Sequence, residues 1–451
     1  MASGTSRMTV FRGVPPPGSP EARTQTILKT LNKPGRNFYI VLLVATLGLL
    51  WFLQAWAYQL QYGLIATDMA DWGTSGGVSW GLYIGSFIWW VGIAHGGIIM
   101  SAAVRLFKLN VFKPITRIAE MVTVGALSVA GMFIVVDLGR PDRVVTSIIP
   151  HFFARIHYSP LVWDVTVITF YFIMSATYLF LSLRDDIYHL RNRLPKVFSP
   201  VYRLLLIDHD PEENVKIQRM LWWLAFAVII MAPLLLHGGV IPWLFQVLPS
   251  MPGWNSAVNG PQFLSIALAS AMSGIAIVAY IFRRAYGWKD IIPDKTFSRL
   301  GAVMALFALF VIWLELQQIV TGLYAPTTGL GTATDARVAS IPFWISMGLI
   351  IFSMLYLAAQ TIFPKKLFSV PRTVGAGVII LLGTFLEKVL FVVDGLAHPA
   401  FNFYPGVPGD YFPTWVELSS FLGAVCIVIL WFALASKVIP VVEVVEQEEE
   451  K

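Results

Sequence analysis

Residues 78–107 read VSWGLYIGSFIWWVGIAHGGIIMSAAVRLF, an apolar run with one histidine and no charged residue before Arg105. A helix that crosses the hydrocarbon core of a bilayer needs about 20 apolar residues, so this run is long enough to span a membrane. Its glycines lie near one face of the helix, at Gly81, Gly85, Gly92 and Gly96. Because small residues at this spacing let helices approach closely, the stretch predicts a tightly packed transmembrane helix.

The rest of the chain has the same character. It has 451 residues, of which 57% are hydrophobic and 13% are charged, and its mean hydropathy is +0.70. Soluble domains carry about 25% charged residues. The composition therefore predicts an all-α polytopic membrane protein. The net charge of +6 does not indicate a nucleic-acid partner, because the basic residues lie in loops between apolar runs.

Ten apolar runs predict ten transmembrane helices. Their predicted bounds are Phe38–Leu60, Val78–Phe107, Ile115–Leu138, Pro160–Leu183, Met220–Trp243, Gln262–Phe282, Leu300–Tyr324, Pro342–Ile362, Val374–Gly395 and Thr414–Ala435. Lys and Arg number six before the first run and up to seven in the loops after the even runs, but three at most in the other loops. Cytoplasmic loops carry this excess, so both termini are expected in the cytoplasm.

The chain contains two similar sets of four apolar runs, namely runs two to five and runs six to nine. The third run of each set opens alike, with HYSPLVWDV at 157–165 and VASIPFWIS at 338–346. Because each set has an even number of runs, the copies share one orientation, which is a parallel repeat. We expect two four-helix bundles flanked by the first and last helices. The predicted units are 1–37 (cytoplasmic segment), 38–77 (first helix and outer loop), 78–243 (first bundle), 244–395 (second bundle), 396–436 (outer loop and last helix) and 437–451 (acidic cytoplasmic tail).

Ionisable residues inside the apolar runs of the first predicted bundle are the main functional signal. A charged side chain at the centre of a bilayer costs about 2.5–3.5 kcal/mol even on insertion scales, so such residues usually have a function. His95 lies near mid-membrane and suits a haem ligand, a proton relay, a ligand contact or a structural hydrogen bond. Asp164 lies about one turn inside the outer face, beside Trp163, and suits accepting a proton from a hydroxyl donor.

Other charges of the first predicted bundle have structural alternatives. Glu120 follows Arg117 by three residues, so an ion pair is expected; its other role is the cytoplasmic entry of a proton path. Asp137 lies near the outer surface, where Arg140 and Arg143 can neutralise Asp137 and Asp142 or meet an acidic partner. His237 is the other histidine within a predicted span, near its outer edge.

The second predicted bundle contains Glu315, Glu387, Lys388 and Asp394. Glu387 and Lys388 are adjacent and point about 100° apart on a helix. We therefore expect Lys388 to pair with Glu315 or Asp394 rather than with Glu387. Either a proton route or a buried ion-pair network explains this group.

Several kinds of site have no sequence signal. The single cysteine, Cys426, excludes an internal disulfide, a thiolate-bound metal and an iron–sulfur cluster, and no metal site is predicted. There is no phosphate-binding glycine loop and no Ser/His/Asp set. The loops predicted on the outer side, at 249–261 and 398–415, are rich in Trp, Tyr, Pro and Gly. They suit an aromatic belt at the membrane interface or, as we favour, a docking surface for a partner.

Four segments in this order carry a family resemblance: WGLYIGSFIWWVGIAHGGIIMSA, RIAEM, VDLGRP and SPLVWDV. Together they resemble the NrfD/PsrC family, the integral membrane subunits of polysulfide-reductase-type complexes, over residues 78–183. The stretch at 234–263 is similar to the ten-span members of alternative complex III, particularly the ActC protein. The resemblance implies a subunit of a quinol:acceptor oxidoreductase complex in a bacterial inner membrane. It implies quinone or menaquinone as substrate and no haem or cluster in this chain.

The same resemblance implies partners and roles. The partners are an iron–sulfur subunit and a multihaem cytochrome on the outer side, and a second NrfD-like membrane subunit. His95, Asp137 and Asp164 would contact and deprotonate a quinol at the outer face, and electrons would leave through the iron–sulfur subunit. The predicted pocket lining is Trp80, Tyr83, Trp163 and His237. The predicted proton path is Glu120, Glu315, Glu387, Lys388 and Asp394.

Three other functions remain open on the sequence. The chain can be the quinone-reducing anchor of a molybdopterin-type reductase, a proton-coupled secondary transporter with His95 and Glu315 as coupling residues, or a passive anchor. A passive anchor predicts that neutralising the buried charges damages assembly without changing turnover per assembled complex.

Overall fold

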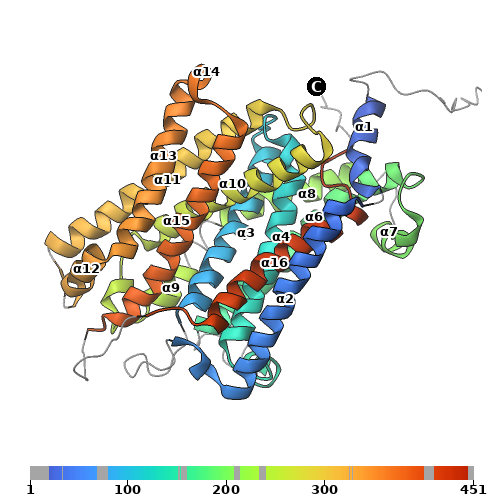
Figure 1. Cartoon of the computed structure of the whole chain (residues 1–451). Helices are drawn as coiled ribbons and strands as arrows, with labels where there is room; N and C mark the ends of the chain where they lie inside the picture. Colours follow the sequence, from blue (N-terminus) through green and yellow to red (C-terminus); the bar gives the residue numbers. More distant parts are fainter. Residues whose placement is uncertain are drawn as a thin grey trace, which may run out of the picture.

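The chain folds into a layered bundle of long helices, shown as a computed structural model in Figure 1. It describes residues 20–32, 34–68, 80–150, 153, 160–207, 214–232, 240–324, 326–327, 329–400 and 411–444. Across these ranges the secondary structure is helical, without a β-strand. Nine helices among the described residues are long and apolar enough to cross a membrane. The chain is therefore an integral membrane protein of the all-α polytopic class, as predicted.

The long helices follow the apolar runs. They are α2 (Arg36–Tyr62), α3 (Leu82–Leu106), α4 (Thr116–Asp137), α6 (Pro160–Leu190), α8 (Asn214–Met231), α10 (Asn259–Tyr286), α11 (Asp294–Tyr324), α13 (Ile341–Ile362), α15 (Val370–Ala397) and α16 (Trp415–Val438). The short ones are α1 (Pro20–Leu28), α7 (Ser199–Leu205), α9 (Ile241–Gln246), α12 (Leu330–Ala339), α14 (Pro364–Leu367), the π-helix η5 (Val144–Ile148) and the 3₁₀ turns η1 (Lys29–Leu31), η2 (Leu64–Ala66), η4 (Lys113–Ile115), η7 (Lys196–Phe198) and η10 (Pro252–Trp254).

Contacts between helices divide most of them into two groups. In the first bundle, α3 packs on α4 and α8, and α6 packs on α4 and α8. In the second bundle, α10 and α13 each pack on α11 and α15. The flanking helices α2 and α16 pack on each other, and α16 lies against α4. The colours of Figure 1 show α3 between the two bundles, where it also contacts α10 and α15.

The glycines of α3 make this central position possible. A Cβ on Gly97 would lie 2.6 Å from Thr123 Oγ1 of α4, and one on Gly85 would lie 2.8 Å from Val389 Cα of α15. A Cβ on Gly96 would overlap Ala271 of α10. Since neighbours approach three of its sides this closely, α3 is buried along almost its whole length.

An aromatic cluster joins the two bundles near the start of α3. Trp80 lies 6.0 Å from both Trp254 and Phe245 between ring centroids, and Phe245 lies 5.2 Å from Phe391 of α15. Trp254 is fully buried and donates a hydrogen bond from Nε1 to the Phe391 carbonyl at 2.9 Å. A Cβ on Gly395 would overlap the Trp254 indole, so this position needs glycine. The tryptophan of loop 249–261 therefore packs inside the fold and belongs neither to an interface belt nor to a docking surface.

Some helix ends differ from the predicted bounds. α6 continues seven residues past Leu183, to Leu190, and α11 begins at Asp294 rather than Leu300. Apolarity marks only the part of a helix within the hydrocarbon, whereas backbone hydrogen bonding continues past the first charged residues. The fifth predicted span, Met220–Trp243, covers part of α8 and the start of α9, and its residues 233–239 lie outside the described structure.

We call the side of the molecule that holds α1, α14 and the end of α16 the terminal side. Lys437 of α16 donates a hydrogen bond to the Thr30 carbonyl at 2.6 Å, and Trp288 of the α10–α11 turn donates one to the Thr26 carbonyl at 3.0 Å. The α12 side is the opposite one and holds α9 and α12 (Figure 1), with η10 in contact with α12. The two sides have different sets of buried charges.

Candidate functional site

Asp164 lies one turn into α6, on the face that packs into the first bundle. Pro160 begins the helix, where a missing N–H and a restricted φ are tolerated. The Asp164 side chain is 2% exposed, and neither carboxylate oxygen has a hydrogen-bond partner among the described residues. A buried polar group without a partner is costly, so this carboxyl group is available to a ligand.

The same face of α6 carries further polar groups. Tyr171 follows Asp164 by seven residues and Ser175 follows Tyr171 by four, so helical periodicity aligns all three. Both are buried, and neither hydroxyl has a hydrogen-bond partner in the described part of the chain. Their spacing of seven and eleven residues from Asp164 was a readable signal, but Tyr171 and Ser175 were not predicted.

His95 faces this row from α3. It is fully buried, and its ring lies edge-on to the Tyr171 ring with 4.5 Å between centroids. The structure thus brings His95 against the Asp164 face of α6. An imidazole can accept or donate a proton near neutral pH, which suits it to a proton relay.

Asp137 lies at the end of α4 and is half-buried. Arg140 donates two hydrogen bonds to Asp142, with Nε at 2.9 Å from Oδ1 and Nη2 at 2.8 Å from Oδ2. Of the two carboxylates that Arg140 could neutralise, it pairs with Asp142. The hydrogen bond from Arg140 holds the pKa of Asp142 below its ordinary value.

The predicted pocket-lining residues have different surroundings. Trp80 belongs to the inter-bundle aromatic cluster, and Trp163 is half-buried beside Asp164. Tyr83 is fully buried and donates a hydrogen bond to Gln59 Oε1 of α2 at 2.6 Å, so its hydroxyl is already engaged. His237 lies outside the described residues.

Glu120 belongs to a cluster of buried ion pairs and hydrogen bonds on the terminal side. Arg117 Nε lies 3.5 Å from Glu120 Oε2, which confirms the predicted ion pair. Ser101 and Ser182 donate hydrogen bonds to the two Glu120 oxygens at 2.9 and 2.7 Å. Arg117 also pairs with Asp186 of α6 at 3.0 Å, a partner that sequence reasoning missed.

A second cluster of buried, paired charges occupies the second bundle. Arg337 of α12 lies 3.0 Å from Glu315 and 3.4 Å from Glu387, and these side chains are almost fully buried. We call Glu315, Arg337, Glu387, Lys388 and Asp394 the Arg337 cluster. Sequence analysis missed Arg337 itself, although it is the one Lys or Arg in the loop between the predicted seventh and eighth spans.

The expected partner of Lys388 was wrong. Its Nζ lies 3.1 Å from Glu387 Oε2, the neighbouring residue, and 3.4 Å from the centroid of the Phe263 ring. The two Cα–Cβ bonds diverge on the helix, but the long lysine side chain bends back. Lys388 is 1% exposed, and the nearest carboxylate and an aromatic face are the partners that its Nζ reaches.

A cavity of about 290 Å³ reaches the Arg337 cluster on the α12 side. Glu315, Arg337 and Asp394 line it together with Gln318. Gln262 donates a hydrogen bond to Glu315 at 2.5 Å, and Gln318 donates one to Gln262 at 2.7 Å. Within the described residues, no group of three or more His, Cys, Asp or Glu side chains has the geometry to hold a metal ion.

Comparison with known proteins locates this chain among membrane subunits of reductases. Residues 71–400 match the family model described as polysulphide reductase, NrfD. A Halobacterium salinarum protein, named as a membrane subunit of dimethyl sulfoxide reductase, is 28% identical, with 89% of this chain and 90% of that protein aligned.

Two further relatives cover most of the chain. A protein of Mesobacillus selenatarsenatis, named as a subunit of selenate reductase, is 23% identical over 80% of this chain and 86% of its own length. The Hdr-like menaquinol oxidoreductase integral membrane subunit of Archaeoglobus fulgidus is 21% identical over 91% of this chain and 96% of its own length. The similarity therefore covers both bundles rather than one of them.

Proposed function

This chain belongs to the NrfD family, and on that premise we propose that it is the quinone-interacting membrane subunit of a reductase-type complex. Two of its relatives have names that assign them to dimethyl sulfoxide and selenate reductases, and a third name refers to menaquinol. A membrane subunit of this kind exchanges electrons and protons between a lipid-soluble quinol and a redox partner. We propose that this partner is an iron–sulfur subunit docked on the α12 side.

Asp164 is the observation that carries the proposal. Its carboxyl group is buried and without a partner among the described residues, whereas Glu120, Glu315 and Glu387 lie within reach of a cation. The fully buried Glu417 accepts hydrogen bonds from the Tyr411 hydroxyl and from backbone N–H groups. A quinol hydroxyl can supply the missing hydrogen bond and then its proton. His95, across from Tyr171, is placed to pass that proton on or to hold the head group.

The chemistry balances without a metal in this chain. Quinol oxidation breaks both O–H bonds, sends the electron pair to the redox partner and releases both protons. Asp164 accepts one proton, and we assign His95 or Asp137 to the other. Trp80, Tyr83, Trp163 and His237 stay predicted lining residues. Quinone reduction uses the same groups in reverse, as in a quinone-reducing anchor.

Substitution of Asp164 tests this site in the assembled complex. Asp164→Asn keeps the shape but cannot accept a proton, so quinol turnover should fall about 100-fold or more. Asp164→Glu should retain part of the activity. Asp142→Asn, in the exposed turn of the α4–α6 connection, is the matched control and should turn over normally. Normal turnover by an assembled Asp164→Asn complex would refute the assignment.

We also propose that the Arg337 cluster exchanges a proton with the α12 side. It contains three carboxyl groups but two cations, so full ionisation would leave one negative charge buried. Such a charge is costly in a membrane, and a proton shared by the cluster removes it. The cavity beside Asp394 and Glu315 supports an exit to that side. Glu120 would be the corresponding entry on the terminal side.

Proton release by reconstituted complexes tests this route. Asp394→Asn should slow the pH change that a dye reports during quinol turnover, because Asp394 lines the cavity. Asp335→Asn, an exposed aspartate of α12, should have no effect. Equal proton release by both variants would leave the Arg337 cluster as a purely structural network.

We propose a cytoplasmic location for the terminal side, from its Lys and Arg content, with the α12 side facing outward. The second candidate function is that of a subunit of alternative complex III. The flanking helices α2 and α16, which pack on each other, favour it. Purification from native membranes separates the candidates. A multihaem cytochrome and a second NrfD-like subunit in the complex would favour alternative complex III, whereas a catalytic reductase subunit would favour the first.

A further inference from the structure

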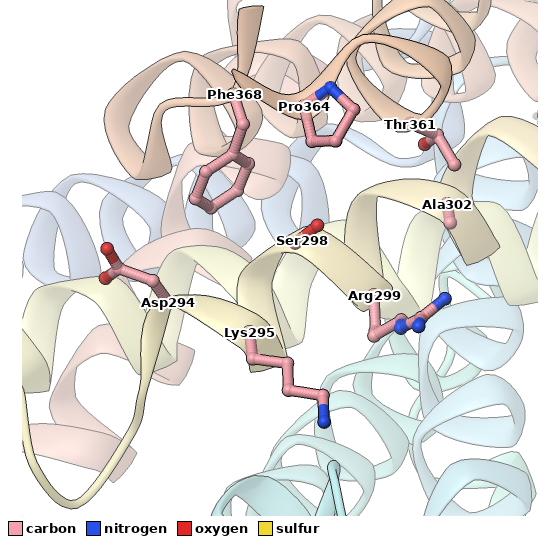
Figure 2. A pocket seen from close by; sticks show the side chains of 8 residues that line it. All are labelled: Asp294, Lys295, Ser298, Arg299, Ala302, Thr361, Pro364 and Phe368. Atoms are coloured by element: carbon pink, nitrogen blue, oxygen red, sulfur yellow. The ribbon is translucent and has the colours of Figure 1, made fainter.

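A groove opens on the terminal side between the start of α11 and the α13–α14 turn. Its volume is about 260 Å³. Figure 2 shows one wall formed by Thr361, Pro364 and Phe368, opposite the first turns of α11. The α11 residues that line it are Asp294, Lys295, Ser298, Arg299 and Ala302.

Tight packing fixes the shape of this groove. A Cβ on Gly301 of α11 would overlap the Gln360 amide, so α11 and α13 are in direct contact below the groove. Thr373 of α15 donates a hydrogen bond to Gln360 Oε1 at 2.9 Å. Tyr356 donates one to the Leu367 carbonyl at 3.1 Å, which ties the α14 turn to α13. The groove is therefore a preformed feature of the second bundle.

The charge of the groove is positive and uncompensated. Lys295 and Arg299 line it, and Lys365 and Lys366 of α14 lie beside Pro364. None of these four side chains makes an ion pair with a described residue. The one acid in the lining, Asp294, already pairs with Arg283. These four side chains are exposed, so an anionic group of another molecule can reach them and supply a counter-charge.

The surroundings indicate that the molecule is a lipid. Exposed apolar side chains continue along α11 and α13 from the groove, including Leu306 and Phe310 on α11 and Phe352 and Leu355 on α13. In a membrane protein such surfaces contact acyl chains. Basic pockets between transmembrane helices on the cytoplasmic side bind anionic head groups. A soluble anion would gain no binding free energy from the adjoining apolar surface.

We propose that this groove binds the phosphate head group of an anionic phospholipid. Lys295 and Arg299 pair with the phosphate, and Ser298 donates a hydrogen bond to it. Lys365 and Lys366 add attraction at the rim, and the acyl chains lie on the apolar faces of α11 and α13. The site is on the opposite side from Asp394 and its cavity, and its lining contains none of the residues proposed for the quinol and proton chemistry.

Native mass spectrometry of the purified complex with phosphatidylglycerol and phosphatidylcholine tests the proposal. Each basic residue near a membrane surface contributes about fivefold to binding an anionic lipid, so the double variant Lys295→Gln/Arg299→Gln should bind phosphatidylglycerol about 30-fold more weakly. Phosphatidylcholine binding should not change. The control Arg193→Gln/Lys196→Gln removes two exposed cations of the α6–α8 connection on the same side. Equal loss in both double variants would overturn the proposal.

Two further measurements identify the source of the phosphate and exclude unfolding. Inorganic phosphate should fail to displace phosphatidylglycerol, because it gains nothing from the apolar faces. Displacement by millimolar inorganic phosphate would assign the groove to a soluble phosphate compound and overturn the lipid assignment. Quinol turnover should stay normal in Lys295→Gln/Arg299→Gln, which shows that the variant is folded and that the effect is local.

Discussion

Asp164 in the first bundle and Glu315 in the second are equally buried, each with 2% of its surface exposed, but their surroundings are opposite. Glu315 lies 3.0 Å from Arg337 and accepts a hydrogen bond from Gln262. Asp164 has neither a cation nor a donor among the described residues. A network of paired charges holds helices together, whereas a lone carboxyl group remains available for a ligand. Burial alone therefore does not separate paired carboxylates from unpartnered ones, and their neighbours in the fold do.

Glu120 sharpens this contrast because it belongs to the first bundle yet resembles Glu315. Arg117, Ser101 and Ser182 surround its two oxygens. The difference thus follows the partners of each carboxylate rather than the bundle in which it lies. Three pairs of variants test this distinction through stability, measured by thermal unfolding of the purified complex, and one further variant tests an exposed ion pair.

Loss of Arg337 should have the largest effect. Arg337→Met leaves Glu315 and Glu387 buried without their shared cation, and breaking a buried pair in this way costs about 3–5 kcal/mol. We expect a large drop in the unfolding temperature or loss of the protein from the membrane. Arg372→Met removes an exposed arginine of α15 that makes no ion pair with a described residue, and should be neutral. Equal stability of both variants would contradict a structural role for the Arg337 cluster.

Loss of Ser182 should have an intermediate effect. Ser182→Ala removes the 2.7 Å hydrogen bond to Glu120 Oε2 and leaves that oxygen without its hydroxyl donor. An unsatisfied buried acceptor costs about 1–3 kcal/mol. Ser128→Ala, whose hydroxyl bonds only its own helix at the Val124 carbonyl, is the control and should change stability little. A Ser182→Ala protein as stable as the control would show that Glu120 is not held in the way we describe.

Loss of Asp164 should leave stability almost unchanged. Asp164→Leu replaces an unpartnered polar group by an apolar one of similar size, so the change should be within about 1 kcal/mol and toward higher stability. Glu315→Leu, at equal burial, should be clearly destabilising because it leaves Arg337 short of a partner. If Asp164→Leu destabilised the protein as much as Glu315→Leu, the comparison between the two carboxylates would fail.

The exposed Arg140–Asp142 pair should have the smallest effect. Because Arg140 lowers the folded-state pKa of Asp142, the pair stabilises the fold above the ordinary pKa of aspartate. This contribution disappears as pH falls through the lowered folded-state value. Unfolding temperatures of Arg140→Ala and the unmodified protein should therefore differ slightly at neutral pH and converge in acid. A difference that grows in acid would contradict the assigned direction.

Much of the fold was predictable because a bilayer imposes simple rules. Apolar runs had to become helices, since lipid cannot satisfy free backbone groups. The glycines of the α3 run indicated close packing, and Gly85, Gly96 and Gly97 have neighbouring helices against them. Helix ends were less predictable, because the backbone of α6 and α11 continues past the point where apolarity stops.

The candidate site was only partly predictable. Asp164 and His95 were selected as unusual residues in apolar runs, and both are buried in the first bundle. Tyr171, which contacts His95, was missed because a tyrosine in an apolar helix has no unusual composition. Lys388 was assigned the wrong partner, because helical geometry gives directions of Cβ atoms and does not include the reach of a long side chain.

The sequence by itself determined that this is a helical membrane protein and which of its ionisable residues are buried, because those properties depend on local apolarity and helical period. Only the tertiary structure decided which buried charges are paired. Arg337 reaches Glu315 and Glu387 from positions 22 and 50 residues away in the chain, while Asp164 meets no such partner in the described structure. Pairing depends on how separate helices pack, and that packing is a property of the whole bundle.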